Sequence, residues 1–91
     1  MNRGNLKSIP NCLRKYRRIR GLKQKQVAAI LGVKSTGMIC RWENGQSFPN
    51  IANLFKLAIL YRTLPDALFF DLRQALKEQI LRREKVIHSG N

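Results

Sequence analysis

The sequence predicts an all-α domain of five helices, the last longer than a small domain needs. Two observations support this prediction. Apolar residues recur three and four positions apart in five separate stretches, which is the spacing of half-buried helices. Glycine or proline stands between most of the stretches, where a helix must end or begin. The length of 91 residues and the apolar fraction of 44% suit one small folded domain.

The first helix is expected to begin with Ser8 as its cap and Pro10 in its first turn. It would run to about Arg20 and stop at Gly21, because glycine reaches a left-handed backbone at little steric cost. The side chains expected to face inward are Leu13, Tyr16 and Ile19.

The next stretch, residues 24–45, indicates two short helices joined by a tight turn. Apolar residues at helical spacing predict a helix from Gln24 to Leu31, and Gly32 ends it. Ser35 or Thr36 would cap the following helix, expected over about residues 36–44, with Ile39 and Trp42 facing inward. This is the helix-turn-helix plan, in which the second helix enters the DNA major groove.

Two further helices complete the prediction. Pro49-Asn50 opens one that spans Ile51 to about Arg62, with Leu54, Leu57, Ala58 and Tyr61 facing inward. Pro65-Asp66 opens the other, which runs to about Ile87 with Leu68, Leu72, Leu76 and Ile80 along one side. The chain therefore divides into a basic arm (1–8), a helix-turn-helix domain (9–70) and a C-terminal helix extension (71–91).

Several short motifs resemble the Cro/repressor (XRE-like) helix-turn-helix family when taken in order. They are Leu22-Lys23-Gln24, Val27-Ala28, Leu31-Gly32-Val33, Ile39-Cys40-Arg41-Trp42-Glu43-Asn44-Gly45, Pro49 and Leu57-Ala58. The resemblance covers roughly residues 13–69. It implies a five-helix lambda-repressor-like DNA-binding domain, here with an extended C-terminal helix, and a role in transcription regulation.

Two residue roles follow from the resemblance. Gln24 would hydrogen-bond a DNA phosphate at the start of its helix, and Arg17 would pair with Glu43. The sequence also favours this pair, because Glu43 is a rare acid in a basic region and needs a cationic partner. The alternative is a solvated Glu43 with several diffuse cationic neighbours.

The chain departs from the family by one extra residue before the inward-facing isoleucine. Without an insertion, Arg41 would occupy the buried position that suits Trp42, and burying an unpaired charge is too costly. We therefore place the extra residue within positions 34–37.

The predicted DNA contacts lie on both helices of the motif and in the loop after it. Arg41 suits guanine or phosphate, and Thr36 and Met38 suit a thymine methyl group, although Met38 could belong to the core instead. The full set is Gln24, Lys25, Lys34, Ser35, Thr36, Gly37, Met38, Arg41, Asn44, Gln46 and Ser47.

Composition narrows the class of protein. Eighteen Lys and Arg against five Asp and Glu give a net charge of +13, which favours a polyanionic partner.

The sequence has no nucleophile–base set and no phosphate-binding loop, so we expect no catalysis and no cofactor. Its two cysteines and one histidine do not favour a zinc site, so we expect no metal. Cys12 and Cys40 are expected to be reduced, with a disulfide as the alternative. Neither a membrane span nor a signal-peptide core is visible, so we expect a cytoplasmic protein.

The function predicted first is a sequence-specific double-stranded DNA-binding regulator, repressor-like, that binds as a homodimer to half-sites about 34 Å apart. The C-terminal helix would form the dimer contact, or would be a partly frayed tail. The alternative function is an antitoxin that grips a protein partner through this helix and represses its own operon. An RNA-binding adaptor fits less well, because exposed aromatic residues for base stacking are scarce.

Overall fold

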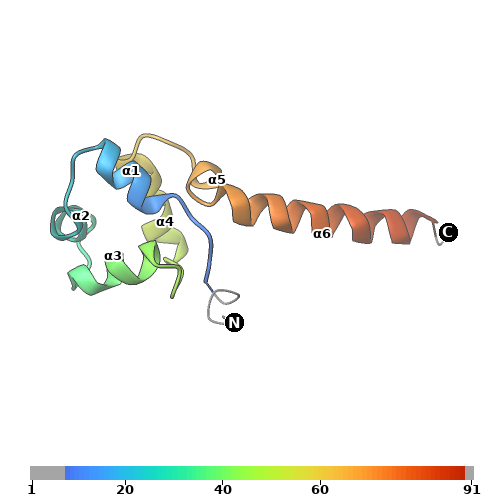
Figure 1. Cartoon of the computed structure of the whole chain (residues 1–91), viewed down its shortest axis with the longest axis horizontal. Coiled ribbons are helices and arrows are strands. Elements are labelled where there is room, and N and C mark those ends of the chain that lie inside the picture. Colours follow the sequence, from blue (N-terminus) through green and yellow to red (C-terminus); the bar gives the residue numbers. More distant parts are fainter. Residues whose placement is uncertain (1–7, 90–91) are drawn as a thin grey trace.

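The computed structural model describes residues 8–89 as a succession of helices joined by short loops (Figure 1). Of the expected basic arm, all but Ser8 lies outside the described residues. The all-α prediction is confirmed, since the described part of the chain contains no strand. It contains six helices rather than five: α1 (Leu13–Ile19), α2 (Gln24–Leu31), α3 (Thr36–Glu43), α4 (Ile51–Leu60), α5 (Pro65–Leu68) and α6 (Phe70–Ser89).

One hydrophobic core lies between α1, α2, α3, α4 and α5. Each of these helices contributes at least one side chain that is at most 1% exposed: Leu13, Val27, Ile39, Leu57 and Leu68. The predicted inward positions of Leu13, Ile39 and Leu57 are therefore confirmed. Burying such side chains supplies the main driving force for folding, at about 1.5–3 kcal/mol each.

The turn between α2 and α3 follows the prediction. Gly32 adopts the left-handed conformation with φ +76°, and its backbone N–H donates to the carbonyl of Ala28 at 3.0 Å. Ser35 occupies the N-cap position of α3, although its side chain forms no capping hydrogen bond. Trp42 is 4% exposed while Arg41 is exposed, so the predicted inward position of Trp42 is confirmed.

The predicted start of the first helix is wrong. α1 begins at Leu13, whose N–H donates to the side-chain oxygen of Asn11 at 3.0 Å. Residues 9–12 instead cross the end of α3: the N–H of Ile9 donates to the carbonyl of Gly45 at 2.9 Å. The Asn11 side-chain amide donates to the carbonyl of Trp42 at 3.1 Å. Ile19, expected to face inward, is 69% exposed.

The boundaries of α4 are set by one side chain and one backbone conformation. The side chain of Asn50 accepts a hydrogen bond from the N–H of Asn53 at 2.8 Å, so it caps the helix. The helix ends at Leu60, two residues before the predicted end. Arg62 cannot extend it, because its φ is +56°.

The last predicted helix, from Pro65 to about Ile87, is divided at Phe69. The carbonyl of Leu68 accepts a hydrogen bond from the N–H of Cys12 at 2.8 Å, and Phe69 leaves the helical conformation with φ −126° and ψ 44°. Its ring is buried against Phe48, with ring centroids 4.7 Å apart. Packing on the core therefore interrupts a pattern that looks continuous in sequence.

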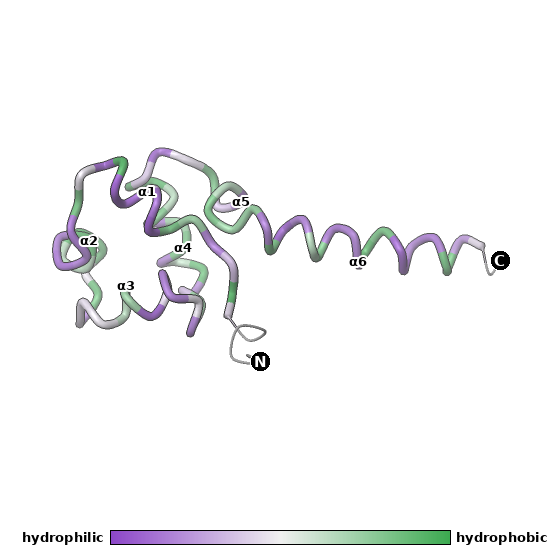
Figure 2. The backbone as a smooth tube through the Cα atoms, in the orientation of Figure 1, coloured by the Kyte–Doolittle hydropathy of each residue, from purple (hydrophilic) through white to green (hydrophobic). Residues whose placement is uncertain are grey.

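α6 projects from the body of the protein as a separate rod (Figure 1). None of its residues is buried, and it stretches the protein to 53 × 34 × 22 Å. Figure 2 shows hydrophilic and hydrophobic positions mixed along it. None of the helices in residues 8–89 combines the length and the apolar character needed to cross a membrane.

Candidate nucleic-acid interface

α3 presents one side to the core and the other to solvent. Ile39 and Trp42 anchor the inner side, being at most 4% exposed. Thr36 and Arg41 are exposed on the outer side. A helix held by its inner side alone leaves its outer side available for a groove of a duplex.

Gly37, which is costly in a helix, lies in the first turn of α3 beside the side chain of Arg41. A Cβ atom at this position would lie 3.4 Å from Nη1 of Arg41 and 3.6 Å from Oγ of Ser35. The guanidinium group of Arg41 therefore lies back over the first turn of α3, across the space left by the missing side chain. This position places one positive charge over the first turn of α3.

The remaining predicted contacts fall into two groups. Met38, Gln24, Gly37 and Ser47 are half-buried, and Met38 packs against the core cluster, as its alternative interpretation proposed. The other residues of the predicted set are exposed around α3 and at the start of α2. They are Lys25, Lys34, Ser35, Thr36, Arg41, Asn44 and Gln46.

The carboxylate of Glu43 joins the first three helices. Nε of Arg17 lies 2.6 Å from Oε2, and Nη2 of Arg17 donates to Oε1 at 3.1 Å. Nε2 of Gln24 donates to Oε1 at 2.9 Å. Nε of Arg14 lies 3.4 Å from the same oxygen. One buried carboxylate thus fixes α1 and the start of α2 against the end of α3.

Glu43 is ionised although its side chain is 1% exposed. Burial opposes the charge and would raise its pKa, but the hydrogen bonds from Arg17 and Gln24 and the charges of Arg17 and Arg14 lower the pKa below its usual value. In return, the hydrogen bond to Glu43 raises the pKa of Arg17. The charge is therefore stable and hidden from any ligand at the surface.

Hiding this carboxylate has a consequence for the electrostatic surface. Glu43 is the one acid in residues 8–63, where eleven Lys and Arg occur. With the acid buried and paired, the exposed charges of this part of the protein are positive. Such a surface attracts phosphate from a distance.

Arg14 also belongs to the site. Its Nη2 donates to Oδ1 of Asn44 at 2.7 Å, and Asn44 in turn donates to Sγ of Cys40 at 3.4 Å. The signal was present, because Arg14 and Arg17 are three residues apart and so share one side of a helix. Cys12 and Cys40 are both free thiols.

The fold and this cationic surface define a helix-turn-helix protein that binds DNA. A family model described as helix-turn-helix matches residues 13–68, more than half of the chain. The chain therefore belongs to the XRE-type (Cro/repressor) helix-turn-helix family, a family of DNA-binding regulators rather than of enzymes. No curated protein and no solved structure gives a significant match.

Proposed function

We propose that this DNA-binding regulator is a sequence-specific transcriptional repressor that binds duplex DNA as a homodimer, with one α3 in the major groove of each half-site. The observation that carries the proposal is the outer side of α3. It is exposed and cationic, while the acid at its end is buried by two arginines. An occupied groove at an operator blocks access of other proteins to that site.

Affinity and base preference would come from different side chains. Gln24 and Lys25 lie in the first turn of α2, where free backbone N–H groups and the helix dipole favour a phosphate. Thr36 and Arg41 lie on α3, where a guanidinium group can bind the O6 and N7 atoms of guanine. Asn44 and Gln46, exposed after α3, would contact phosphates on the other side of the groove.

The test is selection of bound duplexes from a random pool by the purified protein. We expect an enriched sequence with two related halves. Arg41→Ala should lose the preference at one position of each half while still binding DNA. Arg82→Ala is the matched control, because it removes the same charge from α6, and it should return the wild-type sequence. Selection without an enriched sequence would contradict base recognition.

An antitoxin is the second candidate function, and α6 favours it. This helix exposes Leu76, Ile80 and Ile87, each at least 49% exposed, which a toxin could cover. Co-expression with the product of an adjacent gene, followed by purification, tests this function. A stoichiometric complex that masks α6 would support it, and homodimers that already cover α6 would argue against it.

A further inference from the structure

An apolar groove lies where α6 leaves the body of the protein. It measures about 430 Å³, and its apolar lining includes Phe48, Leu54, Phe69, Leu72, Leu76 and Ile80. Beyond the groove, Ile87 continues the apolar side of α6, seven residues after Ile80 and 66% exposed. A helix without tertiary contacts is marginal in water, so this side of α6 needs a cover.

The charge of α6 argues against DNA as the partner that covers its apolar side. Residues 70–89 carry three of the five acids of the chain beside five Lys and Arg, a net charge of +2, whereas residues 8–63 carry eleven Lys and Arg beside one acid. A helix of mixed and largely balanced charge has little attraction for a polyanion. It can approach a second copy of itself, however, without the repulsion that two strongly positive domains would experience.

Two charges border the apolar side of α6 and can complement each other. Lys77 and Glu84 are seven residues apart, two helical turns, so they lie on the same flank of the line through Leu76, Ile80 and Ile87. Neither forms an ion pair with another described residue. The acid at the edge of the groove, Asp66, is already paired with Arg73 at 2.9 Å.

We propose that α6 pairs antiparallel with α6 of a second copy around a two-fold axis close to Ile80. Antiparallel helices bring equal flanks together, so Lys77 of each copy faces Glu84 of the other, twice in the dimer. Parallel helices would bring opposite flanks together and leave both charges without these partners. Ile87 of one copy then covers the groove near Leu72 and Leu76 of the other.

This arrangement rests on the proposed function, which supplies the two-fold assembly on DNA. It adds the contact through which the two copies would associate. α6 has twenty residues and is about 30 Å long. Figure 1 shows α3 in the body, beyond the beginning of α6. Antiparallel pairing therefore leaves the two recognition helices free and more than about 30 Å apart, as half-sites one or two turns of DNA apart require.

Charge reversal in the full chain, without DNA, tests the pairing. Lys77→Glu and Glu84→Lys should each raise the dissociation constant of the dimer about ten-fold in analytical ultracentrifugation, because each places like charges together twice. The double variant exchanges the two charges and should restore the wild-type constant. Circular dichroism should show that α6 is helical in all variants at high protein concentration.

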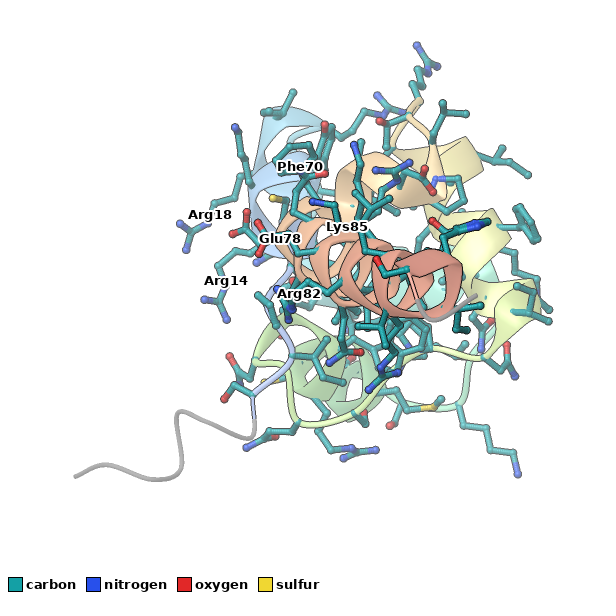
Figure 3. All side chains as sticks on the ribbon, turned by 90° about the vertical axis from the view of Figure 1, so that its right-hand side faces the viewer. Arg14, Arg18, Phe70, Glu78, Arg82 and Lys85 are labelled. Atoms are coloured by element: carbon teal, nitrogen blue, oxygen red, sulfur yellow. The ribbon has the colours of Figure 1, made fainter. Side chains whose placement is uncertain are left out.

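The chain offers a matched control for these variants. Glu78 and Lys85 are also seven residues apart but lie on the other side of α6, which Figure 3 shows toward Arg14 and Arg18 of α1. Glu78→Lys and Lys85→Glu should leave the dissociation constant unchanged. The proposal is overturned by a monomeric wild-type protein, by single variants that dimerise normally, or by a double variant that does not recover. Because DNA is absent, none of these results decides whether the protein recognises a sequence.

Discussion

Glu43 shows how a single side chain can position a whole surface. Side-chain nitrogen atoms of Arg17, Gln24 and Arg14 lie within 3.4 Å of its carboxylate oxygens. The one carboxylate therefore connects α1, α2 and α3. The desolvation cost of burying it is offset only while these partners remain. The same carboxylate also holds Gln24, a proposed phosphate contact, so stability and DNA binding are linked at this residue.

Glu43→Gln should destabilise the fold by about 3 kcal/mol, because it leaves the half-buried guanidinium of Arg17 without its counter-charge. Urea unfolding followed by circular dichroism measures this change. Glu78→Gln is the control on an exposed helix, and we expect a change below about 0.5 kcal/mol. Equal stability of the two variants would contradict a structural role for the buried ion.

The lowered pKa of Glu43 also predicts how stability depends on pH. A carboxyl group with a lower pKa in the folded state stabilises the fold fully above its unfolded pKa of about 4.3. The contribution is lost as pH falls through the lower folded-state pKa. Unfolding free energies should therefore decline below about pH 4, and Glu43→Gln should remove part of this decline.

Gln24→Ala should weaken binding to the selected duplex and to an unrelated duplex by the same factor, about ten-fold, because a phosphate contact carries no sequence information. Fluorescence anisotropy with both duplexes measures the two constants. The unfolding free energy of the variant must be measured too, since Gln24 also donates to Glu43. A loss confined to the selected duplex would assign Gln24 to base recognition.

At the scale of elements, backbone contacts decide where helices begin and end. The apolar pattern and Pro10 suggested an early start for α1, but Ile9 and Asn11 bind the end of α3 instead. Likewise the pattern from Leu68 to Ile80 continues through Phe69, where the helix breaks. Both errors have one cause: a backbone group found a partner distant in sequence, which no local pattern reveals.

The contact of residues 9–12 with the end of α3 predicts that substitutions at two glycines will differ in their effect on stability. A Cβ atom at Gly45, where φ is +73°, would lie 2.6 Å from the carbonyl oxygen of Ile9. Gly21 has a similar φ of +68°, but nothing lies within 4 Å of its Cβ position. Gly45→Ala should therefore lower the free energy of unfolding by about 2 kcal/mol more than Gly21→Ala does, as measured by thermal unfolding. Equal losses would mean that Ile9 does not pack there.

At the scale of the whole molecule, charge and apolar surface are separated. The helix-turn-helix part carries the excess of positive charge, and α6 carries exposed apolar residues among balanced charges. One part suits a polyanion and the other suits a protein surface. The protein can therefore contact a polyanion at one end of its 53 Å length and a protein surface at the other.

This separation predicts the salt dependence of DNA binding. The logarithm of the affinity should fall linearly with the logarithm of salt concentration, because bound lysines and arginines release counterions. Lys25→Ala should reduce the slope by about 2 if a dimer binds with one such contact per copy, and by about 1 for a monomer. Titrations at several salt concentrations measure the slope, and an unchanged slope would remove Lys25 from the interface.

The sequence by itself determined the all-helical class, the helix-turn-helix stretch and the register that buries Trp42 and exposes Arg41. These features depend on local periodicity, on glycine conformation and on the cost of burying a charge, all of which act within a few residues. Only the tertiary structure decided where α1 begins, why the last helix divides, and that Arg14 and Gln24 share the carboxylate of Glu43. Those outcomes depend on contacts between residues about 19 to 56 positions apart, which form only when the chain is packed.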